Sequence, residues 1–188
     1  MRKNLAILIV VVVILFGLYQ VVKLQYNRLV ALDQKVNETW AQVENVLQRR
    51  NDLIPNLVNT VKGYAKHEKE LFTEVTRLRS QISGAGTVSE KAVLSDQLSA
   101  ALGRLLLVVE NYPQLRASEN FLRLQDELAG TENRIAIERK RYNEAVREYN
   151  RTVKSIPIVF FMNILPFEKE KPYFTAEPEN TQPPRVEF

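Results

Sequence analysis

The side chains able to do acid–base or metal chemistry are few in this sequence, and they begin with a single histidine, His67. His67 is followed by Glu68, but no second histidine stands at the spacing of a His-Glu-x-x-His zinc site. One histidine and no cysteine leave no ready Ser-His-Asp or Cys-His system, and they exclude thiol nucleophiles and cysteine metal sites. We expect His67 and Glu68 to be polar groups of a helix surface or a structural hydrogen bond.

Phosphate-binding and di-iron signatures are also missing. The segment Gly84-Ala85-Gly86 lacks the lysine and the preceding strand of a phosphate loop, so it predicts a plain loop. A bundle di-iron site needs Glu-x-x-His pairs, and the supply of histidine rules out its usual version. We therefore predict no catalytic residue, no cofactor and no metal, and we expect the protein not to be an enzyme.

Five polar residues form the first candidate interaction site: Asn51, Asp52, Asn56, Asn143 and Asn150. Asn143 and Asn150 each follow a tyrosine, one heptad apart, and the other three surround Pro55. Buried hydrogen bonds that fix helix register and satisfy the backbone freed by the proline would explain them. The alternative is a recognition surface for a partner helix.

An apolar strip, residues 156–167, is the second candidate. Its potential contact residues are Phe160, Phe161, Met162, Ile164 and Leu165. The strip is too short to span a bilayer as a helix. It could fold back on the body, lie in the membrane interface or dock a partner. If four antiparallel helices alternate, the last returns towards the membrane and brings the strip to the bilayer, whereas three would leave it on the far side.

An uncharged segment at the N-terminus predicts a membrane anchor. Residues 5–22 read LAILIVVVVILFGLYQVV, which as a helix spans about 27 Å and approaches a hydrocarbon core of about 30 Å. Tyr19 lies where an amphipathic ring favours the interface. No small-x-small cleavage site follows, so we expect an anchor rather than a cleaved signal peptide. The numbers of basic residues before and after the span are nearly equal, so they hardly determine the membrane orientation. We slightly favour an orientation with the body on the extracytoplasmic side.

Beyond the anchor, apolar residues recur at steps of three and four and predict long helices. The segments are residues 24–82, 90–111 and 118–156. The pattern passes Pro55 and Gly63 in register, which favours one kinked helix over two. Ser89 and Ser118 are expected N-caps. The third segment repeats an apolar row every seven residues, as helices packed at shallow angles do.

The motifs of this chain resemble those of the LemA family of bacterial membrane proteins. The matching stretches include WAQVENVLQRRNDLIPNLVNTVKGYAKHE from Trp40 and TENRIAIERKRYNEAVREYN from Thr131, with residues 26–30, 111–128 and 184–188. The resemblance implies an all-α fold, an N-terminal transmembrane helix followed by an antiparallel four-helix bundle. It brings no catalytic site, and it suggests an HtpX-type membrane protease as a partner.

Four regions follow from these patterns. They are a short N-terminal tail at 1–4, the anchor at 5–22, the helical bundle at 23–156, and the apolar strip with a Pro-rich tail at 157–188. The tail is expected to be extended or disordered unless it docks on the bundle.

A membrane-anchored scaffold or adaptor is the function that these features favour, acting through contacts with another membrane protein or with copies of itself. The alternative is a lipid- or envelope-surface-binding module that uses the strip. Nucleic-acid binding is disfavoured, because 22 acidic residues nearly balance 26 basic ones and no base-reading module occurs.

Overall fold

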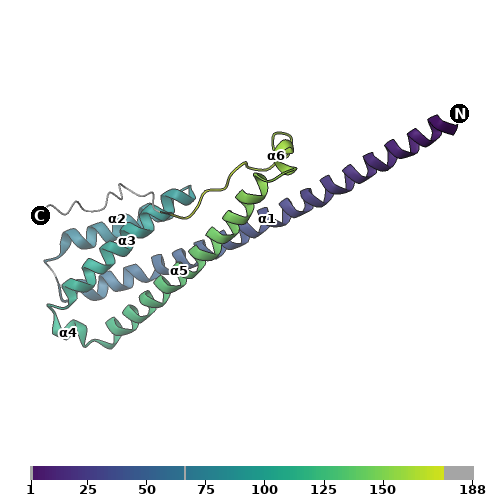
Figure 1. Cartoon of the computed structure of the whole chain (residues 1–188). Coiled ribbons are helices and arrows are strands. Elements are labelled where there is room, and N and C mark those ends of the chain that lie inside the picture. The colour runs from purple at the N-terminus through teal and green to yellow at the C-terminus, as the bar shows by residue number, and fades with distance from the viewer. Residues whose placement is uncertain (1, 66, 176–188) are drawn as a thin grey trace, which may run out of the picture. The chain divides into compact units, whose positions relative to one another are not determined.

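The structure, a computed structural model that describes residues 2–65 and 67–175, is all-α within those residues. Its helices are α1 (Arg2–Lys62), α2 (Lys69–Gly84), α3 (Val88–Val109), α4 (Pro113–Arg116), α5 (Glu119–Val153) and α6 (Ile158–Phe161) (Figure 1). This confirms the predicted fold class. The chain forms two compact units: residues 2–38 with 144–171, called unit 1, and residues 39–143 with 172–175, called unit 2.

Unit 2 is a helical bundle around one apolar core. The second half of α1, α2, α3 and the first half of α5 each contribute buried side chains at helical spacing, and α4 adds Leu115. Leu57, Val75, Leu98 and Leu105 are fully enclosed. Fully burying a side chain of this kind stabilises the fold by about 1.5–3 kcal/mol, so this core is what holds the four long segments together.

The predicted single kinked helix over residues 24–82 is wrong. Helix α1 continues through Pro55 and ends at Lys62, and α2 begins only at Lys69. The amides of Tyr64 and Ala65 both donate to the Val61 carbonyl, at 3.0 and 2.9 Å, and close a turn there. The apolar register survives this turn because both helices face the same core, so an unbroken register did not require one helix.

The caps of the later helices explain where those helices begin. Thr87, rather than the predicted Ser89, is the N-cap of α3, and it forms a reciprocal capping box with Glu90. Helix α5 begins directly after Ser118, as expected, and runs through Gly130 without a break. Gly130 is exposed, and a Cβ atom added to it would have no neighbour within 4 Å. Close packing therefore does not explain why a glycine stands there.

Unit 1 contains the apolar first part of α1, the last part of α5, α6 and an extended segment up to Lys171. The side chains from Ile7 to Leu18 are broadly exposed, with the large apolar ones at 45–64%. Helix α3 is also long and apolar enough to cross a membrane. However, 39% of the most apolar 18-residue stretch of α3 is buried inside the structure, whereas 0% of the corresponding stretch of α1 is buried. The pattern therefore identifies α3 as a core helix and α1 as the candidate membrane span.

Candidate functional site

The apolar strip of residues 156–167 packs on α1 just beyond the candidate span. One small cavity in unit 1 is enclosed by Val22, Gln25, Tyr26 and Leu29 from α1 together with Pro157, Ile158, Phe161 and Leu165 from the strip. The rings of Tyr26 and Phe167 are 5.6 Å apart at their centroids, in a tilted arrangement. The strip is thus attached to α1 through one of its faces.

The other face of the strip is open. Of the predicted contact residues, Met162 is buried and Leu165 is half-buried, whereas Phe161, Phe160 and Ile164 are exposed at 38%, 70% and 82%. The strip therefore both folds back on the chain and presents large apolar side chains outwards.

Asn143 and Asn150, two of the predicted recognition residues, hold the segment that follows the strip. In unit 2, the Asn143 amide accepts from the Phe174 backbone N–H at 2.8 Å and donates to the Phe174 carbonyl at 3.2 Å. In unit 1, Asn150 makes the same pair of bonds to Lys171, at 2.8 and 2.9 Å. The heptad spacing of the two asparagines thus matches two backbone groups of one extended segment.

The remaining three predicted polar residues have different surroundings on α1. Asn51 is buried, donates from Nδ2 to the Ser83 hydroxyl at 3.4 Å, and accepts from Arg79 Nε through its backbone carbonyl. Asp52 and Asn56 are exposed, and Asp52 accepts from Gln48. Within unit 2, these three residues thus have surroundings different from the C-terminal segment that Asn143 contacts.

A buried arginine, Arg50, lies in the seam of α1 and was not recognised from the sequence. Its guanidinium donates to the Glu132 carboxylate at 2.7 Å, to the Ser99 hydroxyl at 2.9 Å and to the Ser95 hydroxyl at 2.7 Å. Only 1% of the Arg50 side chain is exposed. The signal was present, because Arg50 occupies the seam position between Leu47 and Ile54, where an apolar residue would continue the pattern.

Phe174 was also missed, and it anchors the C-terminal segment of unit 2. It is fully buried, with the Trp40 ring centroid 6.0 Å and the Arg139 guanidinium 5.3 Å from its own ring. Arg139 also donates from Nε to the Phe174 carbonyl at 2.9 Å. The available signal was a pair of aromatic residues, Tyr173 and Phe174, in an otherwise polar segment.

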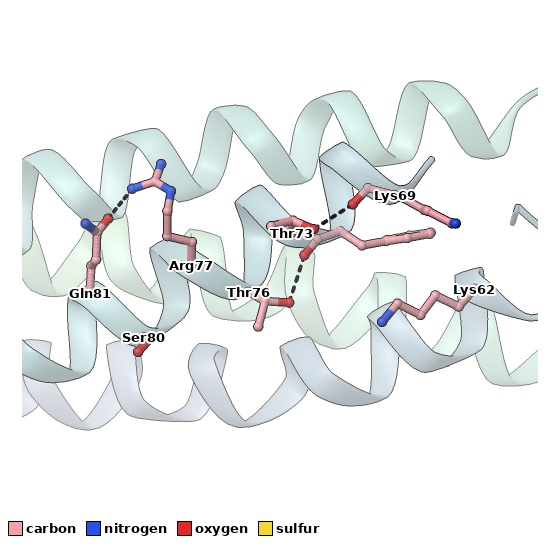
Figure 2. A pocket seen from close by; sticks show the side chains of 8 residues that line it. Lys62, Lys69, Thr73, Thr76, Arg77, Ser80 and Gln81 are labelled. Atoms are coloured by element: carbon pink, nitrogen blue, oxygen red, sulfur yellow. Dashed lines mark hydrogen bonds between the residues drawn. The ribbon is translucent and has the colours of Figure 1, made fainter. Parts of the chain in front are cut away.

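An open groove with basic walls lies on unit 2 where α1 ends and α2 runs (Figure 2). Its volume is about 980 Å³, and its lining residues are Lys62, Lys69, Phe72, Thr73, Thr76, Arg77, Ser80 and Gln81. Three of these are cations and none is a carboxylate. Lys62 Nζ lies 5.7 Å from the Phe72 ring centroid, over an otherwise buried aromatic floor.

The hydroxyls of the groove are largely satisfied within α2. Thr73 donates to the Lys69 carbonyl and Thr76 to the Phe72 carbonyl, both at 2.8 Å, and Arg77 donates to Gln81 (Figure 2). The ammonium groups of Lys62 and Lys69 come from two different helices and are both exposed. The groove therefore offers positive charge over an apolar floor.

Comparison with known proteins decides the family. The sequence pattern that defines the LemA family matches residues 39–188. The chain belongs to the LemA family. The match includes all the described residues of unit 2 and the segment that carries Asn143, Asn150 and the apolar strip.

Relatives of this LemA-family chain include two magnetosome proteins. Magnetosome protein MamQ 2 of Paramagnetospirillum magneticum is 24% identical over 204 residues, which cover 95% of this chain and 75% of the relative. Magnetosome protein MamQ of Magnetospirillum gryphiswaldense is 24% identical over 186 residues, covering 85% and 68%. Protein LemA of Metamycoplasma hominis is 24% identical over 125 residues, covering 66% and 57%.

The side chains with metal-binding chemistry are dispersed in the part of the LemA-family chain that the structure describes. His67 lies exposed in the turn between α1 and α2. Within residues 2–65 and 67–175, no three His, Cys, Asp or Glu side chains are grouped to hold a metal ion. The features with definite geometry are thus the strip, the asparagine contacts, the buried Arg50 and the basic groove.

Proposed function

We propose that this LemA-family protein is a membrane-anchored, non-catalytic scaffold that binds another protein through its helical body at a bacterial membrane. The observation that carries the proposal is the contrast between its two exposed surfaces. The first part of α1 exposes large apolar side chains, whereas the groove of unit 2 exposes cations over an apolar floor. The first surface suits lipid and the second suits a protein segment.

Membrane anchoring is supported by the exposure of α1. A helix whose side chains are apolar on every side would be unfavourable in water, because each exposed apolar residue loses about 1.5–3 kcal/mol relative to its buried state. The same segment is favourable in hydrocarbon, where its backbone groups are satisfied within the helix. Its length is close to the thickness of a bilayer core.

The basic groove is the proposed docking site for the partner. Lys62, Lys69 and Arg77 offer charge to carboxylates, and the aliphatic parts of the lining side chains offer apolar contact above Phe72, which is itself only 3% exposed. An amphipathic helix or extended segment with acidic residues on one face is complementary to this surface, because charge pairing sets orientation while the apolar contact adds affinity. The partner that we propose is therefore a protein with an acidic amphipathic segment near the membrane.

Site-specific photocrosslinking in native membranes tests this function. A photoreactive amino acid replaces Thr73, which is exposed in the groove, and the products are identified by mass spectrometry. The same crosslinker is then combined with Lys62→Glu, Lys69→Glu and Arg77→Glu. The matched control combines it with Arg116→Glu, Arg134→Glu and Lys140→Glu, three exposed cations of unit 2 outside the groove.

We expect one defined protein adduct at position 73 that is lost in the groove variant and kept in the control variant. Both variants change the net charge equally, so a difference between them reports the groove itself. No adduct at position 73, or equal loss in the two variants, would contradict the proposed docking site. An adduct made only of this chain would show self-assembly and would replace the partner by a second copy.

A further inference from the structure

The apolar strip and the serine before it carry no charged side chain along thirteen consecutive residues. Residues 155–167 read SIPIVFFMNILPF. Ile158 and Met162 point into the protein, with 3% and 7% exposed, whereas Ile156, Phe160 and Ile164 have 77%, 70% and 82% exposed. The strip thus has an inward face and an outward face, and the most exposed large side chains of the outward face, Ile156, Phe160 and Ile164, are apolar.

The position of the strip along α1 is set by its inward face. Within unit 1, Ile158, Phe161 and Leu165 enclose a small cavity together with α1 residues from Val22 to Leu29. Val22 is the last residue of the uncharged segment, and Tyr26 is one turn beyond it. The strip is therefore attached where the candidate membrane span ends.

The depth of this attachment follows from helix geometry. A bilayer has a hydrocarbon core of about 30 Å and measures about 40–45 Å with its headgroups, which leaves roughly 5–8 Å of interface on each side. A helix rises about 1.5 Å per residue, so the four or five residues after Val22 cross that layer. For a membrane span that ends at Val22, Tyr26 and the strip residues packed on it would lie at headgroup level.

We propose that the outward face of the strip, Ile156, Phe160 and Ile164, inserts into the interfacial layer of the bilayer that α1 crosses, as a second membrane contact. The inference rests on the membrane anchoring proposed above. The occupant is a lipid surface, because the exposed face continues the apolar surface of α1 and carries no charge that would orient a protein partner. Arg151, Lys154 and Lys169 flank the strip together with Glu168 and Glu170, and Lys154 pairs with Glu170 at 2.9 Å, so the contact rests on the apolar face rather than on charge.

Depth measurements on the full chain test this contact, and the absence of cysteine makes the labelling specific. Single substitutions Phe160→Cys and Ile164→Cys carry a nitroxide, with Phe16→Cys as the reference inside the span. Glu148→Cys, on the exposed surface of α5 in the same unit, is the aqueous reference. The proteins are reconstituted in vesicles of phosphatidylethanolamine and phosphatidylglycerol. The collision rates of each label with oxygen and with a water-soluble nickel chelate are then compared.

The ratio of oxygen to nickel collisions at positions 160 and 164 is expected to be several-fold higher than at 148 and lower than at 16. A ratio at 160 and 164 equal to that at 148, with position 16 reading as lipid, would overturn the strip contact and leave the anchor intact. Shielding of 160 and 164 from both reagents would also overturn it, because protein would then cover the strip. An aqueous reading at position 16 would overturn the anchor and the strip contact together.

Discussion

Arg50 is a charged side chain enclosed by helices α1, α3 and α5 of unit 2, and its environment is built to keep the charge. Burial lowers the pKa of the Arg50 guanidinium, while the charge of Glu132 and its hydrogen bond oppose that change. The two serines supply further acceptors. Removing the Glu132 carboxylate should therefore change the free energy of unfolding by a different amount from removing the Arg50 guanidinium.

We expect Glu132→Ala to destabilise the protein more than Arg50→Met. The first change leaves a buried cation without its carboxylate, which costs about 3 kcal/mol. The second removes the buried charge and fills the space with an apolar chain, and Glu132 keeps its hydration because its side chain is 53% exposed. Urea unfolding in detergent, followed by circular dichroism, measures both. A larger loss for Arg50→Met would contradict this account of the site.

Asn143 and Asn150 are expected to hold the C-terminal segment on α5. Replacing either residue by Ala removes two hydrogen bonds to the backbone, and each such bond contributes about 0.5–1.5 kcal/mol. We therefore expect about 1–3 kcal/mol of lost stability per variant and faster protease cleavage between residues 168 and 175. Asn56→Ala, at an exposed position, is the control, and cleavage equal to that of the control would refute the role of these asparagines.

High pH should weaken unit 1 through Tyr149 and Lys171. Burial raises the pKa of the Tyr149 hydroxyl, which donates to the Glu168 carbonyl. Burial alone would lower the pKa of Lys171, but its bonds to Glu168 and Asp33 raise that pKa above the ordinary value. Because the pKa values of both groups are higher in the folded state than in the unfolded state, both groups stabilise the fold. This stabilisation is fully present below the unfolded-state pKa values, and it is lost as the pH rises through the folded-state pKa values.

The free energy of unfolding is therefore expected to be level from about pH 7 to 9 and to fall above the ordinary values of 10.0 and 10.5 for tyrosine and lysine. The double variant Tyr149→Phe with Lys171→Met should show a shallower fall. Urea titrations at several pH values check this. An equal slope in the variant would mean that other groups cause the alkaline loss.

At this scale, the sequence predicted residue types better than their roles. Asn143 and Asn150 were recognised by their heptad spacing, but their partners are backbone groups about twenty to thirty residues away, which no local pattern encodes. Arg50 was missed because a buried arginine is rare, and only its place in the apolar seam could have indicated it.

At the scale of elements, Gly103 in α3 and Gly130 in α5 are the weak points of their helices. Both are exposed, and nothing lies within 4 Å of a Cβ built on either. Gly→Ala at each position should stabilise unit 2 by about 0.5–1 kcal/mol, because alanine has less backbone freedom to lose on folding. Chemical denaturation measures the gain. A loss of stability at Gly130→Ala would indicate a contact that the isolated chain does not show.

Helix boundaries illustrate why periodicity fixes faces better than lengths. The apolar steps through Val61, Phe72 and Val75 correctly predicted one buried face. They did not predict that α1 ends at Lys62 and that α2 begins at Lys69, because two helices that pack on one core can keep a common register. Beyond the end of α1, Tyr64 is exposed and its neighbour Ala65 is buried.

At the scale of the whole molecule, the two units differ in the solvent that their surfaces suit. Unit 1 exposes the uncharged first part of α1 and the outward face of the strip, whereas unit 2 exposes charged helix faces and the basic groove. The all-α fold, the candidate span and the family were predicted from the sequence. The groove could not be, because it depends on where α1 stops and α2 begins.

The most direct test of the account is alkaline carbonate extraction of membranes from cells that produce the full chain. Carbonate strips peripheral proteins and leaves proteins whose helices cross the bilayer. We predict that the full chain stays in the membrane pellet, while a variant with Val11→Arg and Ile14→Arg is released, since each charge at mid-span costs about 2.5–3.5 kcal/mol. Release of the unaltered chain into the carbonate wash would contradict a membrane-anchored scaffold.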